Sequence, residues 1–215
     1  MEVYLSEEER VEALKKWWKE NALAIVGGIA LGIAIVAGWN GWKSAQHQKA
    51  EEASNVYQQL LKAVESKQAE PAVKLGERLV ERYPGTTYAA YARLFIAKLK
   101  AESGDLAAVK KTLEELLASD KDENLKHLAG LRMGRVMLAL GESEAALKLV
   151  EPLGHEAMGE FESLYEELKG DLYAEMNRPK DARMAYEKAK QTGETTPLLE
   201  LKINDLAEDT PSPAS

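Results

Sequence analysis

Few side chains in this sequence are placed to do chemistry. The three histidines, His47, His127 and His155, lie far apart along the chain, and there is no cysteine. Metal sites and thiolate nucleophiles need Cys or clusters of His, Asp and Glu, and the sequence carries no HExxH pattern. We therefore expect the histidines to be solvated surface residues, and we predict no metal and no cofactor.

Paired carboxylates are the next candidates, at Glu114–Glu115 and Glu166–Glu167. A glycosidase needs two carboxylates that converge across a cleft, whereas we expect these pairs on the solvated faces of amphipathic helices. The sequence has no GxSxG, P-loop or SxxK motif, and Gly27–Gly28 with Gly32 lacks the GxGxxG spacing of a nucleotide-binding loop. The sequence thus predicts a protein that is not an enzyme. Its net charge of -8 argues against binding to nucleic acid.

The segment 22–42 is the most apolar part of the chain. Ala22 to Gly38 has no charged side chain, and as a helix rising about 1.5 Å per residue the whole segment spans a bilayer core of roughly 30 Å. We predict a transmembrane helix there. The alternatives are a buried core helix and a cleaved signal peptide with its cleavage site after Gly38. The long acidic leader and the length of the apolar core disfavour a signal peptide.

The residues that flank and line this segment support a membrane anchor. The protein's tryptophans all lie beside it, where aromatic rings anchor helices at the headgroup level: Trp17, Trp18, Trp39 and Trp42. Small residues recur every four positions at Ala24, Gly28 and Gly32, which favours close packing against another helix. The alternative is that small residues are simply common in membrane helices.

Basic residues near the two ends of the span predict its orientation. Four precede the span and two follow it closely, at positions 10, 15, 16, 19 and then 43 and 49. By the positive-inside rule, residues 1–21 form a cytoplasmic tail. Residues 43–207 are then translocated, which in a bacterium places them in the periplasm.

The rest of the chain predicts helices separated by turn residues, without a strand. The expected helices cover residues 45–66, 70–82, 86–102, 106–119, 123–140, 144–153, 156–176, 180–190 and 197–207. Gly or Asn shortly past the end of most of them is the usual stop signal, for example at Gly154 and Gly193. We expect residues 208–215 to be disordered.

These helices follow a repeat. Gly104, Gly141 and Asn177 are 37 and 36 residues apart, and small or apolar residues recur at fixed offsets from them. This pattern is similar to the tetratricopeptide repeat, lengthened by two or three residues, and it predicts an all-α solenoid of stacked helical hairpins. A plain helical bundle is the alternative, and the hairpin at 45–82 is weaker and partly a stalk. The residues that define the repeat core are Ala97, Gly104, Leu113, Gly134, Gly141, Ala146, Val150, Gly170, Tyr173, Ala182, Tyr186 and Ala189.

Several short stretches, in order along nearly the whole chain, resemble the YfgM-type family of ancillary subunits of the bacterial SecYEG translocon. They are Met1–Tyr4, Val11–Lys15, Glu20–Asn21 at the start of the Gly-rich span, Gly38–Trp39 with Trp42 at its exit, Asp122–Lys126, Leu131–Arg132 with Arg135–Val136, and Leu201–Leu206. The tail after Leu206 extends past the family pattern.

The resemblance implies a single-pass protein of the inner membrane of Gram-negative bacteria, beside the Sec channel. It implies partners of three kinds: the SecYEG translocon, a periplasmic chaperone of prolyl-isomerase type, and unfolded or nascent polypeptide. The alternatives are an envelope scaffold that uses the repeats with other partners, and a regulatory role for the cytoplasmic tail.

Overall fold

The computed structural model describes residues 7–119 and 122–208 and divides into two units, residues 1–51 and 52–215. The described residues are helical, with no strand among them, so the predicted all-α class is confirmed. Residues 1–6, 120–121 and 209–215 lie outside the described part. Most of the expected disordered tail, residues 208–215, is therefore not described.

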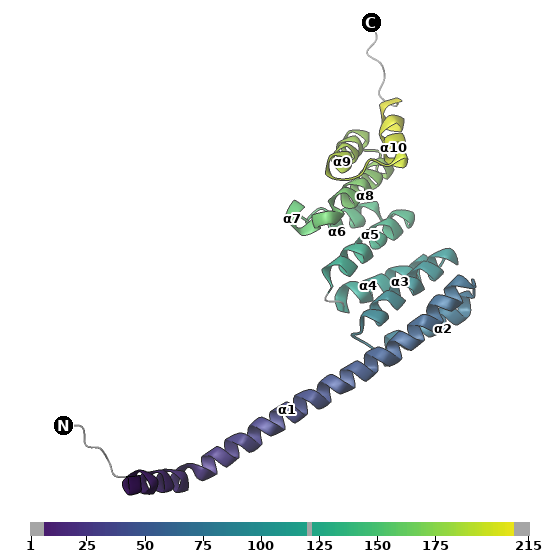
Figure 1. The fold of residues 1–215 in the computed structure, drawn as a ribbon. Coiled ribbons are helices and arrows are strands. Elements are labelled where there is room, and N and C mark those ends of the chain that lie inside the picture. Colours follow the sequence, from purple (N-terminus) through teal and green to yellow (C-terminus); the bar gives the residue numbers. More distant parts are fainter. Residues whose placement is uncertain (1–6, 120–121, 209–215) are drawn as a thin grey trace, which may run out of the picture. The chain divides into compact units, whose positions relative to one another are not determined.

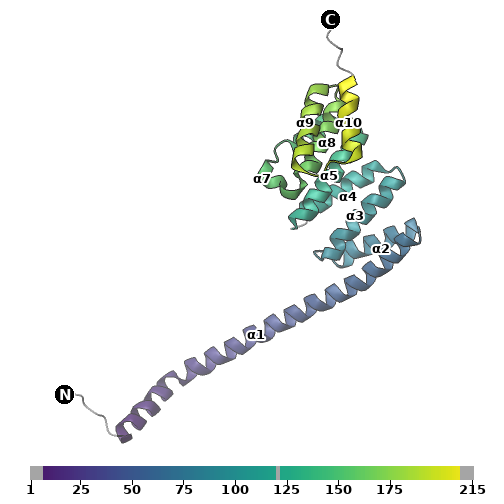
Figure 2. The same cartoon turned by 45° about the horizontal axis from the view of Figure 1, so that its top comes forward.

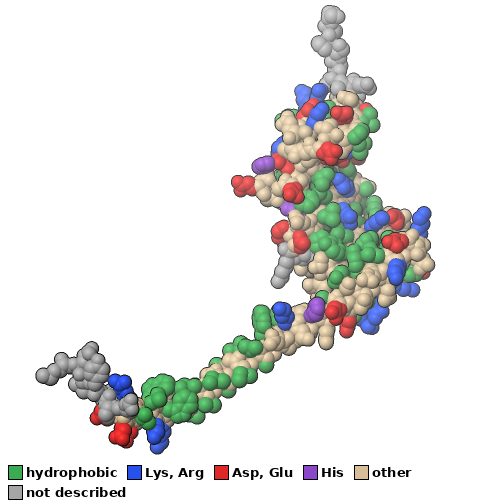
Figure 3. Space-filling view, viewed as in Figure 1, with side chains coloured by type: hydrophobic (Ala, Val, Ile, Leu, Met, Phe, Trp, Pro, Cys, Tyr) green, Lys and Arg blue, Asp and Glu red, His purple; other side chains and the backbone are tan. Residues whose placement is uncertain are grey.

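The first unit consists of the N-terminal part of helix α1 (Glu7–Glu65), which continues into the second unit. The expected separation between the span and a helix at 45–66 does not occur, because residues 39–44 include no proline and the helical hydrogen bonds continue through them. Large apolar side chains of the span are open to the surroundings, including Leu23 at 88% and Ile33 at 65% exposure. Figure 3 shows hydrophobic side chains along this stretch, with charged side chains gathered toward its N-terminal end. Within the described residues, α1 is the helix with the length and composition to cross a membrane.

The second unit is a series of helical hairpins. It contains the end of α1, then α2 (Ala69–Arg82), α3 (Thr87–Glu102), α4 (Leu106–Ser119), α5 (Glu123–Ala139), α6 (Ser143–Val150), α7 (His155–Met158), the 3-10 helix η1 (Gly159–Phe161), α8 (Glu162–Glu175), α9 (Pro179–Thr192) and α10 (Pro197–Glu208). Consecutive hairpins stack in chain order (Figure 1), and α8, α9 and α10 lie side by side at the C-terminal end (Figure 2).

A left-handed residue ends the first helix of each hairpin. Lys67, Gly104, Gly141 and Asn177 have φ of 55°, 80°, 74° and 54°. At Gly141 the turn is closed by two backbone bonds, from Gly141 N to Leu138 O at 3.0 Å and from Glu142 N to Met137 O at 2.8 Å. The other three turns have the same bond pair, the pattern of a Schellman cap.

These turns extend the predicted repeat toward the N-terminus. Lys67 lies 37 residues before Gly104, so the spacing of 36 to 37 residues covers four hairpins. The hairpin at 45–82 is therefore more than a stalk. Its two helices share an apolar core with α3, built around Ala53, Leu60 and Leu79, which are fully buried.

The residues named for the repeat differ in burial. Gly104 and Gly141 are exposed at turns, Tyr173 is half-buried, and the others are buried between helices. Gly170 shows why small residues are needed, because a Cβ there would lie 2.2 Å from Cε1 of Tyr186. A Cβ on Gly134 would lie 2.5 Å from Cδ2 of Leu168.

Two expected helices between residues 144 and 176 differ from the structure. α6 ends at Val150 rather than at Leu153, because Pro152 has no N–H to continue the ladder. Gly154, expected as a stop, instead precedes α7 with φ of −73°. The expected helix 156–176 is broken at Gly159, where φ is +51°, into α7, η1 and α8.

Candidate functional site

The span carries the first set of predicted site residues. Ala24, Gly28 and Gly32 are exposed on α1, and a Cβ added to either glycine would meet no atom within 4 Å. The four tryptophans are between 52% and 62% exposed, and the rings of Trp39 and Trp42 lie 5.4 Å apart. Within the first unit these side chains are exposed, as expected for a helix surface that contacts lipid or another helix.

The repeat domain carries a groove between α3 and α5, which we call the α3–α5 groove. It consists of two adjoining hollows of about 300 Å³ and about 130 Å³ that share Lys98 and Arg132. Its walls come from the first helices of two successive hairpins, and α4 closes its floor. The lining residues are Tyr91, Leu94, Phe95, Ala97, Lys98, Ala101, Val109, Leu113, Arg132, Arg135 and Val136. Figure 3 shows hydrophobic side chains with Lys and Arg beside them over this part of the domain.

The sequence builds this groove through small residues. Ala97 and Ala101 lie one helical turn apart on α3, and their short side chains leave the space that larger residues would fill. Val109 and Leu113 of α4 then form an apolar floor. The result is a concave apolar surface with polar groups only at its rim, which is the usual composition of a binding groove.

The polar rim of the groove is basic. Arg132 donates from Nη1 to the carbonyl of Leu94 at 3.3 Å, and the side chain of Arg135 makes no hydrogen bond or ion pair with the described residues. Burial, and then the neighbouring charge of Arg135, lower the pKa of the Arg132 guanidinium. Lys98 lies 3.8 Å from Glu102, but both side chains are more than half exposed, so this pair is weak.

An aromatic cluster extends this surface from α3 to α1. The ring of Tyr57 lies 5.4 Å from Tyr88, 6.1 Å from Tyr91 and 6.2 Å from Phe95. Burial, with smaller contributions from Tyr91 and Tyr88, raises the pKa of the Tyr57 hydroxyl. The cluster therefore adds flat apolar contact area with tyrosine hydroxyl groups beside the groove.

The histidines are placed differently from one another. The side chain of His47 is 78% exposed, as expected. His127 is half-buried, with its ring stacked on Phe161 at 5.1 Å and edge-on to Tyr165 at 5.7 Å, so the expectation of a solvated residue is wrong there. His155 is exposed, but its Nδ1 contacts the buried carboxylate of Glu162.

The carboxylate pairs also divide. Glu114 and Glu115 are exposed, but Glu166 is only 4% exposed, so the expectation for Glu166–Glu167 is wrong. Glu166 accepts from Lys188 at 2.9 Å and from Lys169 at 3.0 Å.

A second part of this network joins α8 to α10. Lys202 lies 2.7 Å from both Glu167 and Asp171, and Asp171 accepts from the hydroxyl of Tyr186 at 2.8 Å. These acids hold α8 to α9 and α10. Within the described residues, no group of three or more His, Asp or Glu converges to hold a metal ion.

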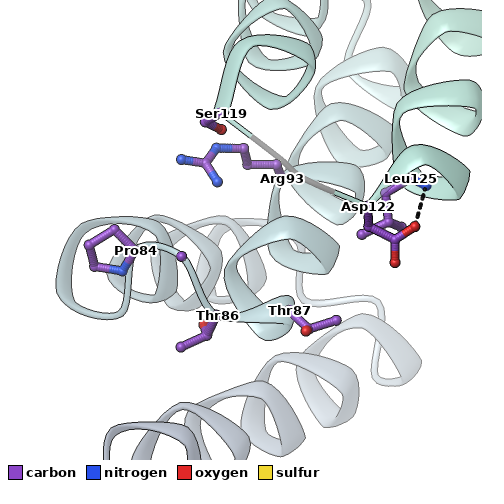
Figure 4. Close-up of a pocket in the computed structure, with 8 residues that line it drawn as sticks. Pro84, Thr86, Thr87, Arg93, Ser119, Asp122 and Leu125 are labelled. Carbon is purple, nitrogen blue, oxygen red and sulfur yellow. Dashed lines mark hydrogen bonds between the residues drawn. The ribbon is translucent and has the colours of Figure 1, made fainter. Parts of the chain in front are cut away.

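Another hollow, of about 400 Å³, lies between the starts of α3 and α5. Figure 4 shows the guanidinium of Arg93 extending toward Ser119, on the side away from Asp122. Asp122 caps α5 by accepting from Leu125 N at 3.3 Å, and Thr86 caps α3. Five of its eight lining residues are polar or charged, and most of the eight lie at helix ends, so fewer apolar side chains line this hollow than line the α3–α5 groove.

Stacked hairpins with a left-handed turn every 36 to 37 residues define a tetratricopeptide-like repeat protein. The family model described as a tetratricopeptide repeat-like domain matches residues 15–208. The chain belongs to the family of ancillary SecYEG translocon subunits. It is 31% identical to the ancillary SecYEG translocon subunit of Escherichia coli, over 96% of this chain and 100% of the relative. The protein of the same name from Haemophilus influenzae is 30% identical, over 94% of this chain and 98% of the relative.

Solved structures show the same fold at lower identity. MamA from Desulfovibrio magneticus superposes with a TM-score of 0.56 at 16% identity, covering 74% of this chain and 90% of that one. A tetratricopeptide repeat protein from Parabacteroides merdae superposes with a TM-score of 0.54 at 15% identity. This match covers 72% of the present chain and 57% of that protein. The predicted repeat architecture is confirmed.

Sequence reasoning missed the basic rim of the groove. In the sequence, Arg132 and Arg135 were noted only because they resemble the family pattern. Their spacing also indicates a basic surface on one helix. They lie on one side of a helix, and no acidic residue stands three or four positions from either. Unpaired arginines on the first helix of a repeat would have indicated a binding surface.

Proposed function

We propose that this chain is a non-enzymatic adaptor, anchored in the bacterial inner membrane and associated with the Sec translocon. Relatives of nearly the same length are named ancillary SecYEG translocon subunits. The observation that carries the proposal is the uncovered apolar surface of α1, joined in one chain to a repeat domain with an open groove.

The proposed topology has residues 1–21 in the cytoplasm, a span at 22–42 and residues 43–207 in the periplasm. The excess of basic residues before the span supports this orientation. Protease added to spheroplasts should then degrade the repeat domain and leave a short N-terminal fragment. A repeat domain that survives until the membrane is opened with detergent contradicts the orientation.

The proposed role of the repeat domain is to bind translocated polypeptides in the α3–α5 groove and pass them to a periplasmic chaperone of prolyl-isomerase type. A photocrosslinking amino acid in place of Tyr91 should capture nascent secretory chains or that chaperone in intact cells. The same substitution at Arg183, exposed on α9, is the control. Equal capture from both positions argues against the groove.

The proposed contact with the translocon is made by the small residues of the span. Leucine at both Gly28 and Gly32 removes the close approach that small residues allow. We expect this variant to recover less SecYEG in detergent pull-downs. The matched control is leucine at Ala30 and Ala34, which have the same spacing on the opposite side of the helix. Normal recovery with Gly28→Leu and Gly32→Leu removes the span from the mechanism, and recovery of other envelope proteins in place of SecYEG favours the scaffold alternative.

A further inference from the structure

The α3–α5 groove differs in charge from the rest of the protein. The chain has 36 acidic and 28 basic residues, yet the groove is lined by three basic side chains and by no acidic one among the described residues. A hollow at the start of α6, by contrast, is lined by Glu142, Glu144 and Glu175 with a single lysine. A cationic groove on an anionic protein indicates a local selection for negative charge.

The two arginines of the rim lack an internal counter-charge. Arg132 and Arg135 lie on the same side of α5, and within the described residues the Arg132 side chain donates its hydrogen bond to a backbone carbonyl, that of Leu94. Two neighbouring guanidinium groups repel each other, and partial burial of one of them raises the cost of its charge. A carboxylate bound between them would relieve both effects, because each guanidinium can hold a carboxylate through paired hydrogen bonds.

We propose that the α3–α5 groove binds acidic-apolar polypeptide segments, in which a Leu-like or Phe-like side chain has Asp or Glu beside it. The inference rests on the proposed polypeptide-binding function and specifies its ligand. The apolar side chain enters the larger hollow, over Ala101 and Leu113. The neighbouring carboxylate pairs with Arg135 and Arg132 at the rim, and Lys98 adds positive charge on the α3 side.

A protein segment fits this site better than an anionic membrane surface. Lipid recognition by charge uses clusters of about four to eight Lys or Arg on an accessible face. Here three basic groups surround a recessed apolar floor. A flat headgroup layer cannot reach such a floor, whereas one side chain of an extended segment can.

The test uses the full-length chain in phosphatidylcholine nanodiscs and two fluorescent peptides. One peptide alternates leucine with glutamate, and the other replaces every glutamate with glutamine. Fluorescence anisotropy gives the dissociation constants. We expect the wild-type chain to bind the acidic peptide more tightly, with a preference that falls as salt is raised.

Variants of the rim connect this preference to the groove. Arg135→Gln removes an exposed group without an internal bond, so the fold should persist. Losing the charged hydrogen bond between Arg135 and the peptide carboxylate should weaken binding of the acidic peptide roughly 10-fold. The affinity for the neutral peptide should not change. The double variant with Arg132→Gln should abolish the preference. Arg183→Gln, a matched change on α9, should leave both affinities unchanged.

A variant of the floor separates failure of this inference from failure of the proposed function. Ala101→Leu fills the larger hollow and should weaken both peptides. Equal affinity of the wild-type chain for the two peptides, with Ala101→Leu still weakening both, overturns acidic selection and leaves the polypeptide groove in place. If Ala101→Leu changes neither affinity, the groove is not the binding site and the inference fails with it. Displacement of the acidic peptide by phosphatidylglycerol nanodiscs from wild type, but not from Arg135→Gln, assigns the rim to lipid and also overturns it.

Discussion

Gly170 on α8 faces the ring of Tyr186 on α9, and replacing it with alanine tests whether the repeat depends on this close contact. A Cβ at position 170 would lie 2.2 Å from Cε1, 2.3 Å from Cδ1 and 2.9 Å from Cγ of the tyrosine. The ring is 3% exposed and its hydroxyl donates to Asp171 at 2.8 Å. The ring is therefore enclosed by neighbouring side chains and fixed by its hydroxyl group, so it cannot move aside without losing a contact.

The expected loss follows from two opposing terms. Overpacking a filled core costs about 1–3 kcal/mol, and three clashing ring atoms place this site in the upper half of that range. Alanine also has a higher helix propensity than glycine, which stabilises the helix by about 1 kcal/mol. The net destabilisation is then about 1–2 kcal/mol, which for a domain of this size lowers Tm by roughly 2–8 °C.

Thermal unfolding followed by far-ultraviolet circular dichroism measures this change on the full chain in detergent. Tryptophan fluorescence does not serve, because all four tryptophans lie within residues 17–42. Gly134→Ala is the matched control. Its Cβ would meet only Cδ2 of Leu168 closer than 3.0 Å, a terminal methyl on a side chain that can rotate, so we expect a change under about 1 kcal/mol.

A second substitution makes the reasoning refutable. Tyr186→Leu opens space opposite Gly170, so its combination with Gly170→Ala should lose less stability than the sum of the single changes. A Gly170→Ala variant that melts at or above the wild-type temperature contradicts the close contact. Strict additivity of the two substitutions contradicts it equally.

Three further changes test other contacts, each by unfolding of the purified chain. Lys67→Gly should stabilise by about 1 kcal/mol, since Lys67 holds a left-handed φ of 55° that glycine adopts without strain; a lower Tm contradicts this. Burial raises the pKa of Tyr165 to about 12 from 10.0, so the unfolded state loses its proton first and stability should fall by roughly 2–3 kcal/mol as pH rises from 10 to 12. In urea titrations, Tyr165→Phe should lose less stability over that window. Lys188→Met removes one positive charge that pairs with the buried carboxylates of Glu162 and Glu166. We expect it to lower the free energy of unfolding by only roughly 1 kcal/mol, because solvent screens the charge of the half-exposed Lys188. A hydrogen bond from Lys188 to Glu166 raises the pKa of this lysine above 10.5, so the difference should hold at neutral pH and vanish only in stronger alkali.

The turns of the repeat could be predicted because their cause is local. Gly104, Gly141 and Asn177 are residue types that tolerate positive φ, and each follows an amphipathic helix. Lys67 has no such preference, so residue type gave no signal at the first turn. The spacing of the repeat, continued one unit toward the N-terminus, would have located it.

The break before α8 could not be predicted in the same way. A single glycine inside a helical pattern costs only about 1 kcal/mol, so Gly159 did not outweigh the helix-forming residues around it. The structure instead places Met158 at 2% exposure in the main core and interrupts the helix at Gly159, where φ is +51°. Burial of one side chain against distant helices decided the local conformation.

The α3–α5 groove could not be predicted from the sequence, because its apolar floor and the arginines of its rim come from different hairpins. Ala97 and Leu113 belong to one repeat, and Arg132 and Arg135 to the next. Their proximity depends on how consecutive hairpins stack. The sequence contained the arginines and the small residues separately, and only packing brought them to one surface.

The distribution of paired and unpaired charge separates structural groups from binding groups in this domain. On α8, Glu166 contacts Lys169 and Lys188, so this buried charge is compensated within the fold. On α5, Arg132 and Arg135 have no acidic partner among the described residues. Folding free energy alone favours pairing buried charge or replacing it with an apolar residue. Arg132 joins α5 to α3 through its hydrogen bond to the Leu94 carbonyl, but that bond supplies no counter-charge to either arginine. In the proposed complex, an acidic ligand supplies it.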